Sequence, residues 1–174
     1  LLKHAANVPG CAEAIEQIFV DAGYLHGLVT NLRMDHDVAE EVIEDPRVAG
    51  VTLTGSTQAG QAIAAIAGRA LKKTVLELGG SDPYVILDDA DLQKAVRAGV
   101  NNCYFNSGQT CSAWTRMLVP KEKLDEATAI AKATAERFTV GDALEGKAKL
   151  GPLVSEQQRD RVRSYIRKGV EEGA

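Results

Sequence analysis

The sequence predicts an α/β fold with a parallel, doubly wound sheet, and three observations lead to that prediction. Short runs rich in Val, Ile, Leu and Thr end in glycine, as strands do at a turn. Between these runs lie segments in which apolar residues recur at helical spacing. The two patterns alternate along the chain, which favours parallel βαβ units with right-handed crossovers and helices on both faces of the sheet.

The elements of the first half can be placed in order. A helix begins near Pro9, carries apolar residues at helical spacing and ends at Gly23. The elements predicted after it are a strand, a short helix, a strand, a helix and a strand, at 27–33, 37–45, 47–55, 59–73 and 74–80.

The pattern changes after the glycine pair at 79 and 80, so we expect one domain at 1–79 and a second at 80–174. The second domain starts with a strand and an acidic turn, followed by a helix capped near Asp89 or Asp91. Ser155 is a candidate N-cap for the last helix. The remaining elements predicted here are a strand and two helices, at 115–120, 122–138 and 155–173.

Composition and charge exclude several classes of protein. The chain has 174 residues, 45% of them hydrophobic, and a net charge of -4 without a basic patch, which argues against nucleic acid as a partner. It has no apolar run of about eighteen residues and no signal sequence at its start, so we expect a cytoplasmic protein without a membrane partner. The chain begins at Leu1 within a strand-like run and stops in a helical pattern. We infer a fragment of a longer protein.

The three cysteines have no pattern typical of a disulfide framework or of a metal site. Cys11 and Cys103 lie in helical patterns and fit a packing role, although a redox pair of Cys103 with Cys111 is an alternative. Cys111 differs because its neighbours in FNSGQTCSAW are turn formers and hydrogen-bonding residues. A loop of this kind is typical of backbone that approaches a ligand.

Three short motifs carry candidate chemistry. TLTGSTQAG (52–60) lies at a strand-to-helix junction, where free N–H groups can hold a phosphate; an ordinary N-cap is the alternative. LELGG (76–80) holds Glu77 among apolar neighbours, where burial would raise its pKa toward that of a general base; a rim glutamate facing water is the alternative. In FNSGQTCSA (105–113), Cys111 is a candidate nucleophile beside backbone N–H groups that could bind an oxyanion; a loop cysteine without function is the alternative.

Taken together, in this order and at these separations, the three motifs resemble the signature set of the aldehyde dehydrogenase superfamily, and the resemblance extends over all 174 residues. It implies the later part of a Rossmann-like cofactor domain followed by the start of an α/β catalytic domain. It further implies that Cys111 attacks the aldehyde to form a thiohemiacetal and then a thioester, which Glu77 hydrolyses through water. In the detail of its sequence, the chain is most similar to bacterial succinate-semialdehyde dehydrogenases.

The resemblance also implies a cofactor, NAD or NADP. The residues that it places beside the dinucleotide are Lys3, Thr54, Gly55, Ser56 and Leu78. Ala6 stands where many NAD-preferring members have a glutamate, so strict NAD specificity is not expected. The full-length protein would be a homo-oligomer, a dimer or a tetramer. Two alternatives stay open: a CoA-acylating member, against which Glu77 argues, and a catalytically incompetent fragment or cofactor-binding scaffold of the same fold.

Overall fold

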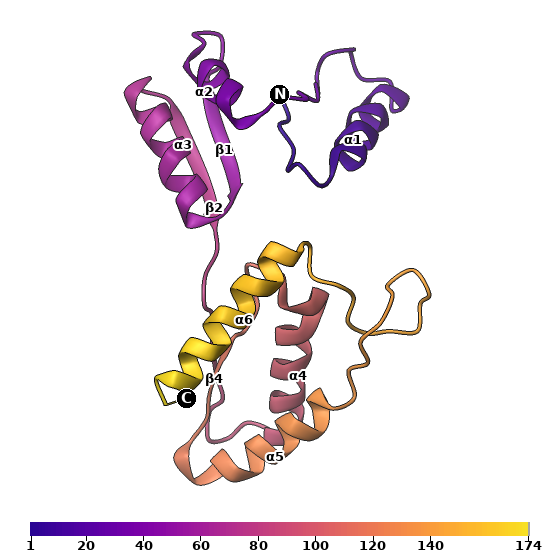
Figure 1. Cartoon of the computed structure of the whole chain (residues 1–174), viewed down its shortest axis with the longest axis vertical. Coiled ribbons are helices and arrows are strands. Elements are labelled where there is room, and N and C mark those ends of the chain that lie inside the picture. The colour runs from indigo at the N-terminus through magenta and orange to yellow at the C-terminus, as the bar shows by residue number, and fades with distance from the viewer. Residues whose placement is uncertain (174) are drawn as a thin grey trace. The chain divides into compact units, whose positions relative to one another are not determined.

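The computed structural model describes residues 1–173 and divides the chain into two compact units, Leu1–Leu78 and Gly79–Ala174. Each unit contains one pair of parallel strands accompanied by helices (Figure 1). The predicted α/β class with parallel strands is thereby confirmed. The roles predicted for the two domains, cofactor binding and catalysis, remain predictions.

The first unit is built around the parallel strands β1 (Gly50–Gly55) and β2 (Lys73–Leu78). The helix α3 (Thr57–Arg69) connects them, and α2 (His36–Glu44) packs against α3 (Figure 1). The helix α1 (Pro9–Asp21) precedes them in the chain. Along β1, half-buried Val51 and Leu53 alternate with exposed Thr52 and Thr54, so one face of the strand pair is covered and the other is exposed.

Local residues explain where these helices begin and end. Pro9 is the first residue of α1, where its missing N–H costs no hydrogen bond, and Gly23 follows the helix with a φ of +82°. The helix α3 begins after Ser56 and ends at Arg69, four residues before the predicted end. It stops there because Leu71 adopts a left-handed φ of 53° and the chain then enters β2 at Lys73.

The strand predicted at 27–33 is wrong as a regular element. This segment makes a single parallel bridge, between Leu2 and Asn31. Leu2 donates its N–H to Thr30 O at 2.8 Å, and Leu32 donates its N–H to Leu2 O at 2.8 Å. A β-rich run forms a strand only where a partner of matching length pairs with it, and here the partner is one residue long.

The second unit pairs β3 (Pro83–Val85) with β4 (Arg116–Leu118) in parallel. Its helices are α4 (Leu92–Tyr104), α5 (Leu124–Ala135) and α6 (Glu156–Glu171), with short 3₁₀ turns η1 (Phe105–Gly108) and η2 (Lys121–Lys123). Its core consists of side chains with at most 7% exposure, from the segment after β3 and from α4 and α5: Ile86, Val96, Val100 and Ala127. This packing holds α4 in place, and α4 leads directly into the loop that carries Cys111.

The helix ends of this unit follow from their capping residues. Asp91, one of the two predicted caps, accepts a hydrogen bond from the N–H of Lys94 at 3.0 Å. Ser155 caps α6 as predicted, accepting from the N–H of Gln158 at 3.2 Å. The helix predicted at 122–138 is shorter, because its first turn is the 3₁₀ turn η2 and it ends at Ala135. Among residues 1–173, no helix is both long and apolar enough to cross a membrane.

Candidate active site

The loop before Cys111 has an unusual backbone. Asn106, Ser107 and Gly108 follow one another with φ of 51°, 58° and 76°, all in the left-handed region. For Asn and especially Ser this conformation costs free energy, about 1–2 kcal/mol for an ordinary L-residue. Such a run persists only where other contacts hold it. The exposed free thiol of Cys111 follows three residues after Gly108.

Those contacts come from residues 151–154, which we call the anchoring segment. The amide of Gln109 donates to Pro152 O at 3.4 Å and accepts from the N–H of Val154 at 2.8 Å. The hydroxyl of Ser107 donates to Gly151 O at 3.0 Å. Three hydrogen bonds therefore join the Cys111 loop to a segment more than forty residues further along the chain.

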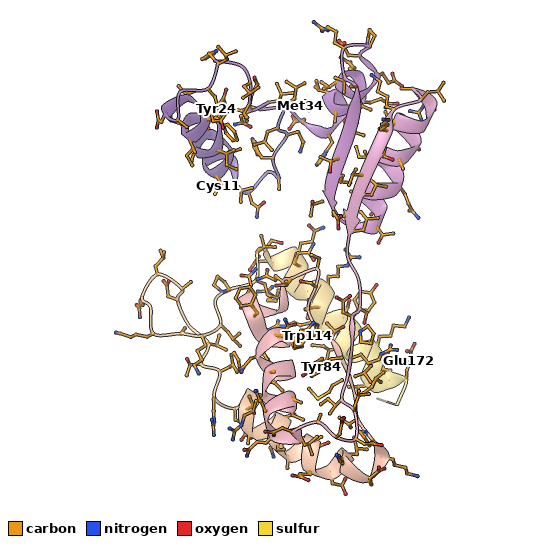
Figure 2. All side chains as sticks on the ribbon, turned by 180° about the vertical axis from the view of Figure 1, so that it is seen from behind. Cys11, Tyr24, Met34, Tyr84, Trp114 and Glu172 are labelled. Atoms are coloured by element: carbon orange, nitrogen blue, oxygen red, sulfur yellow. The ribbon has the colours of Figure 1, made fainter. Side chains whose placement is uncertain are left out.

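The residues that follow Cys111 are held by contacts of Trp114 with α4 and with Tyr84 on β3. The N–H of Trp114 donates to Asn102 Oδ1 at 2.9 Å, and the Trp114 ring stacks on Tyr84 with centroids 4.5 Å apart (Figure 2). Tyr84 in turn donates its hydroxyl to Ala95 O at 3.1 Å. Asn102 and Ala95 both lie on α4, so the helix that precedes the Cys111 loop also fixes the residues that follow it.

The backbone at Cys111 is open to a ligand. Within residues 1–173, the N–H groups of Thr110 and Cys111 have no hydrogen-bond partner. A Cβ at Gly80 would lie 3.9 Å from the carbonyl oxygen of Cys111, so Gly80 passes close to the Cys111 loop. An exposed thiol with a free N–H beside it is the arrangement that an oxyanion-stabilised thiol nucleophile requires.

Glu77 is the second-to-last residue of β2, shortly before the glycine pair, and the register pairs it with Thr54 on β1. Both residues are exposed in this chain. The predicted burial of Glu77 is therefore not found, and the residue matches the alternative of a glutamate on the rim of the sheet. Paired residues of neighbouring parallel strands have side chains on the same face, so Thr54 and Glu77 are neighbours on the exposed face.

The junction between β1 and α3 is held locally. The Oγ of Ser56 accepts a hydrogen bond from the N–H of Ala59 at 3.2 Å, which makes Ser56 the N-cap of α3. Its own O–H stays available as a donor. In the part of the chain that the structure describes, the N–H groups of Thr57 and Gln58 have no partner, as is usual for the first turn of a helix. Gly55 is exposed beside them, so this helix end fits an anionic group such as a pyrophosphate.

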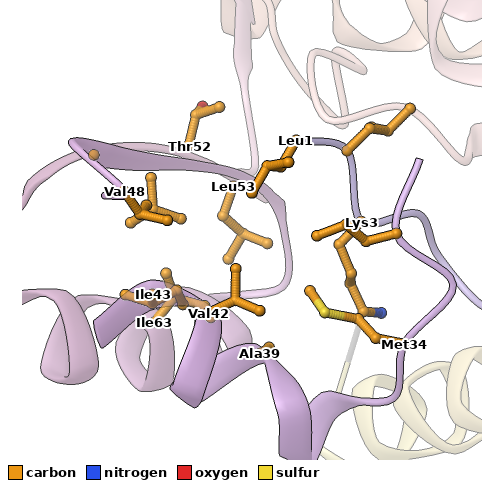
Figure 3. A pocket seen from close by; sticks show the side chains of 14 residues that line it. Leu1, Lys3, Met34, Ala39, Val42, Ile43, Val48, Thr52, Leu53 and Ile63 are labelled. Carbon is orange, nitrogen blue, oxygen red and sulfur yellow. The ribbon is translucent and has the colours of Figure 1, made fainter. Parts of the chain in front are cut away.

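Leu78 and Lys3 occupy different places in the first unit. A Cβ added to Gly60 would lie 2.7 Å from a methyl carbon of Leu78, so Gly60 lets α3 approach the end of β2 closely. Lys3 lines an apolar cavity of about 280 Å³ together with residues of α2 and β1, among them Val42 and Leu53 (Figure 3). The ammonium group of Lys3 donates to His4 O at 3.0 Å.

The structure thus joins some of the predicted residues and separates others. Thr54, Gly55 and Ser56 are consecutive at the end of β1, and Glu77 and Leu78 lie on the adjacent strand. Lys3 lines a cavity to which none of these contributes. Sequence reasoning missed the side chain of Gln109 and the anchoring role of Asn102, because their partners are distant along the chain; the only available signal was their presence beside the Cys111 motif.

Comparison with known proteins identifies the family of the chain. The sequence matches the model of the aldehyde dehydrogenase family over residues 1–174. The chain belongs to the aldehyde dehydrogenase family. It is 45% identical over 174 residues to the succinate semialdehyde dehydrogenase [NAD(P)+] Sad of Escherichia coli, and 42% identical to a succinate-semialdehyde dehydrogenase [NADP(+)] of Deinococcus radiodurans. All of the chain is covered in both alignments, but it spans only 38% and 36% of these relatives' length.

Solved structures of the family agree with this assignment. The chain superposes with a TM-score of 0.95 on succinic semialdehyde dehydrogenase from Streptococcus pyogenes in complex with NADP+, at 37% identity, covering 99% of this chain and 38% of the other. It superposes with a TM-score of 0.94 on aldehyde dehydrogenase C from Pseudomonas syringae in complex with NAD+ and octanal, at 36% identity, covering 99% of this chain and 36% of the other.

Proposed function

We propose that the complete protein containing this chain oxidises an aldehyde to its carboxylic acid with NAD or NADP, and that Cys111 is the nucleophile. The observation that carries the proposal is the exposed thiol of Cys111, held in a structured loop with a free backbone N–H. Membership of the aldehyde dehydrogenase family over the whole chain supports it.

The chemistry at Cys111 follows from the reactivity of a thiolate. The sulfur bonds to the aldehyde carbon, and the carbonyl oxygen takes up the electron pair as an oxyanion. The unpartnered N–H of Cys111 is available to donate to that oxygen. A bound nicotinamide dinucleotide would accept a hydride from the former aldehyde carbon, and as the C=O bond reforms a thioester is left on Cys111. Water then attacks the thioester, which releases the carboxylic acid and restores the thiol.

Glu77 is the residue that we propose to activate this water. As a carboxylate at the end of β2 it can take a proton from water while the new carbon–oxygen bond forms. Its exposure leaves room for a water molecule at the carboxylate. A CoA-acylating enzyme would instead transfer the acyl group to a thiol and would have no need of this base.

The N-terminus of α3 is the part of the chain that we propose to hold the cofactor pyrophosphate. The N–H groups of Thr57 and Gln58 and the Ser56 hydroxyl supply hydrogen-bond donors. Exposed Gly55 allows the pyrophosphate to approach the backbone closely. Thr54 lies next to last in β1, and Leu78 is the last residue of β2. Lys3 would reach the adenosine ribose. Ala6 places no carboxylate there, which is compatible with both NAD and NADP.

Succinate semialdehyde is the substrate that we propose. The support comes from relatives that are 40–45% identical to the chain and are named succinate-semialdehyde dehydrogenases that use NAD(P)+ or NADP+. A cytoplasmic homo-oligomer is the corresponding proposal for the complete protein.

The test is the Cys111→Ser variant of the complete protein, with Cys103→Ser as its matched control. Cys103 is the half-buried thiol on α4. We expect Cys111→Ser to abolish NAD(P)H production from succinate semialdehyde while cofactor binding persists, because a serine hydroxyl ionises far less readily than a thiol. Cys103→Ser should keep wild-type turnover, and added CoA should change neither rate. Retention of more than a few per cent of turnover in Cys111→Ser would contradict the proposal.

A further inference from the structure

The side chain of Gln109 uses all of its hydrogen-bonding groups within one small region. Its Nε2 donates to Asn106 O at 3.1 Å and to Pro152 O at 3.4 Å, and its Oε1 accepts from the N–H of Val154 at 2.8 Å. The main chain of Gln109 adds two contacts: its N–H donates to Asn106 O at 3.2 Å, and its C=O accepts from Asn106 Nδ2 at 3.2 Å. One residue therefore closes the turn on itself and ties it to the anchoring segment.

The turn that Gln109 closes is the one with three consecutive left-handed residues, Asn106 to Gly108. Nothing in the intrinsic preferences of Asn and Ser selects three such conformations in a row. The anchoring segment lies between the bridge of Val140 with Leu150 and the N-cap Ser155 of α6. Gln109 ties the loop to this distant segment of the chain.

We propose that Gln109 is a positioning residue for Cys111, two residues further along, and this inference rests on the proposed function. The bonds of its amide fix the direction in which the chain leaves the left-handed turn, and so the place of the Cys111 sulfur and of the Cys111 N–H. A nucleophile and an oxyanion donor act together only when both are held in place; a displacement of about 1 Å costs about 10²-fold in rate. Among the described residues, the hydrogen-bond partners of Gln109 are Asn106, Pro152 and Val154, so it would act on Cys111 through the backbone.

The test uses Gln109→Met in the complete protein. Methionine keeps the length of the side chain but makes none of the three amide hydrogen bonds. The matched control is Gln158→Met, the same substitution in the first turn of α6, where the glutamine side chain has no described hydrogen bond. Kinetics with succinate semialdehyde, cofactor affinity and hydrogen exchange by mass spectrometry are measured for both variants and for the wild type.

We expect Gln109→Met to lower kcat and the rate of the first NAD(P)H turnover together, by about 10²-fold, with the KM for cofactor within about twofold of wild type. Hydrogen exchange should rise in peptides covering 105–111 and 151–154, and in no others. Gln158→Met should match the wild type in every measurement.

Two results would overturn the inference. If Gln109→Met lowers only the unfolding temperature and keeps kcat within about twofold, the residue is a structural tether without influence on the nucleophile. If exchange at 105–111 and 151–154 is unchanged, the tether itself does not exist. Absence of aldehyde oxidation in the wild type would overturn the proposed function instead, and the exchange data would still show whether Gln109 holds the loop.

Discussion

The two candidate sites of this chain, the junction at Gly55 and Ser56 and the loop at Cys111, are held in opposite ways. The hydroxyl of Ser56 bonds to the N–H of Ala59, three residues away. The Cys111 loop is also held by Gln109 and Ser107 through hydrogen bonds to residues that lie 43 to 45 positions further along the chain. The contact at Ser56 needs only the first turn of its own helix, whereas a loop held at long range takes its shape only when the rest of its unit has folded.

The largest effect that we expect on the free energy of unfolding separates two helical glycines, Gly99 and Gly68, which the sequence alone does not distinguish. A Cβ at Gly99 on α4 would lie 2.9 Å from the ring of Tyr84, which is fixed by its stack on Trp114. Gly99→Ala should therefore lower the free energy of unfolding by about 1–3 kcal/mol, as overpacking does. Gly68 on α3 has nothing within 4 Å of its Cβ position, so Gly68→Ala should raise it by about 0.5–1 kcal/mol.

Urea unfolding of the two variants checks this prediction through their midpoints. Opposite signs for the two substitutions are expected. A shift of the same sign and size for both would mean that the contact of Gly99 with Tyr84 does not constrain the second unit.

A smaller effect separates capping from cofactor binding at Ser56. Ser56→Ala removes the N-cap of α3 and should lower the free energy of unfolding by about 1 kcal/mol. Ser155→Ala removes the equivalent cap of α6 and should cost a similar amount. We expect only Ser56→Ala to weaken NAD(P) binding as well, measured by fluorescence titration. Equal cofactor affinity in the two variants would leave Ser56 as a cap without a role in binding.

The smallest effect concerns a contact between residues only two apart, Asp45 and Arg47. The Arg47 side chain donates to the Asp45 carboxylate at 2.9 Å and 2.7 Å, and this lowers the pKa of Asp45 well below its ordinary value, helped by the backbone N–H of Arg47. A lowered pKa in the folded state adds stability above the unfolded pKa of about 3.9, and that stability is lost as the pH falls through the folded value.

Asp45→Asn should therefore be slightly less stable than the wild type at neutral pH, and the gap should close as the pH is lowered below about 4. Thermal unfolding of both proteins across this pH range measures the gap. A gap that widens on acidification would reverse the assigned sign. Because Arg47 is exposed and Asp45 is only half-buried, we expect this effect to be the least of the three.

The same distinction explains what the sequence could predict. Helices that start at Pro9, Asp91 and Ser155 were predictable because proline and capping residues act on their own neighbours. The strand at 27–33 was not, because a strand depends on its partner, and here only Leu2 pairs with it. The end of α3 was misplaced because no local rule anticipates the left-handed conformation of Leu71.

At the two candidate sites, the sequence predicted which residues stand out better than it predicted the surroundings of those residues. Cys111 could be singled out because a thiol among turn formers is unusual, and Ser56 because it precedes a helical pattern. The burial expected for Glu77 was wrong in this chain, because apolar neighbours in sequence alternate to the other face of a strand. The role of Gln109 required the three-dimensional position of residues 151–154.

The central claim is that a thioester forms on Cys111 and that Glu77 brings about its hydrolysis. Glu77→Gln keeps the size of the side chain and removes the proton acceptor, and Glu41→Gln, at an exposed carboxylate on α2, is the control. Rapid mixing of the complete Glu77→Gln protein with aldehyde and NAD(P) should give a burst near one equivalent of NAD(P)H, then turnover reduced about 10²–10⁴-fold. Mass spectrometry should find the acyl group on the peptide containing Cys111. Wild-type turnover without a burst, or an acyl group that never appears on that peptide, would contradict the account.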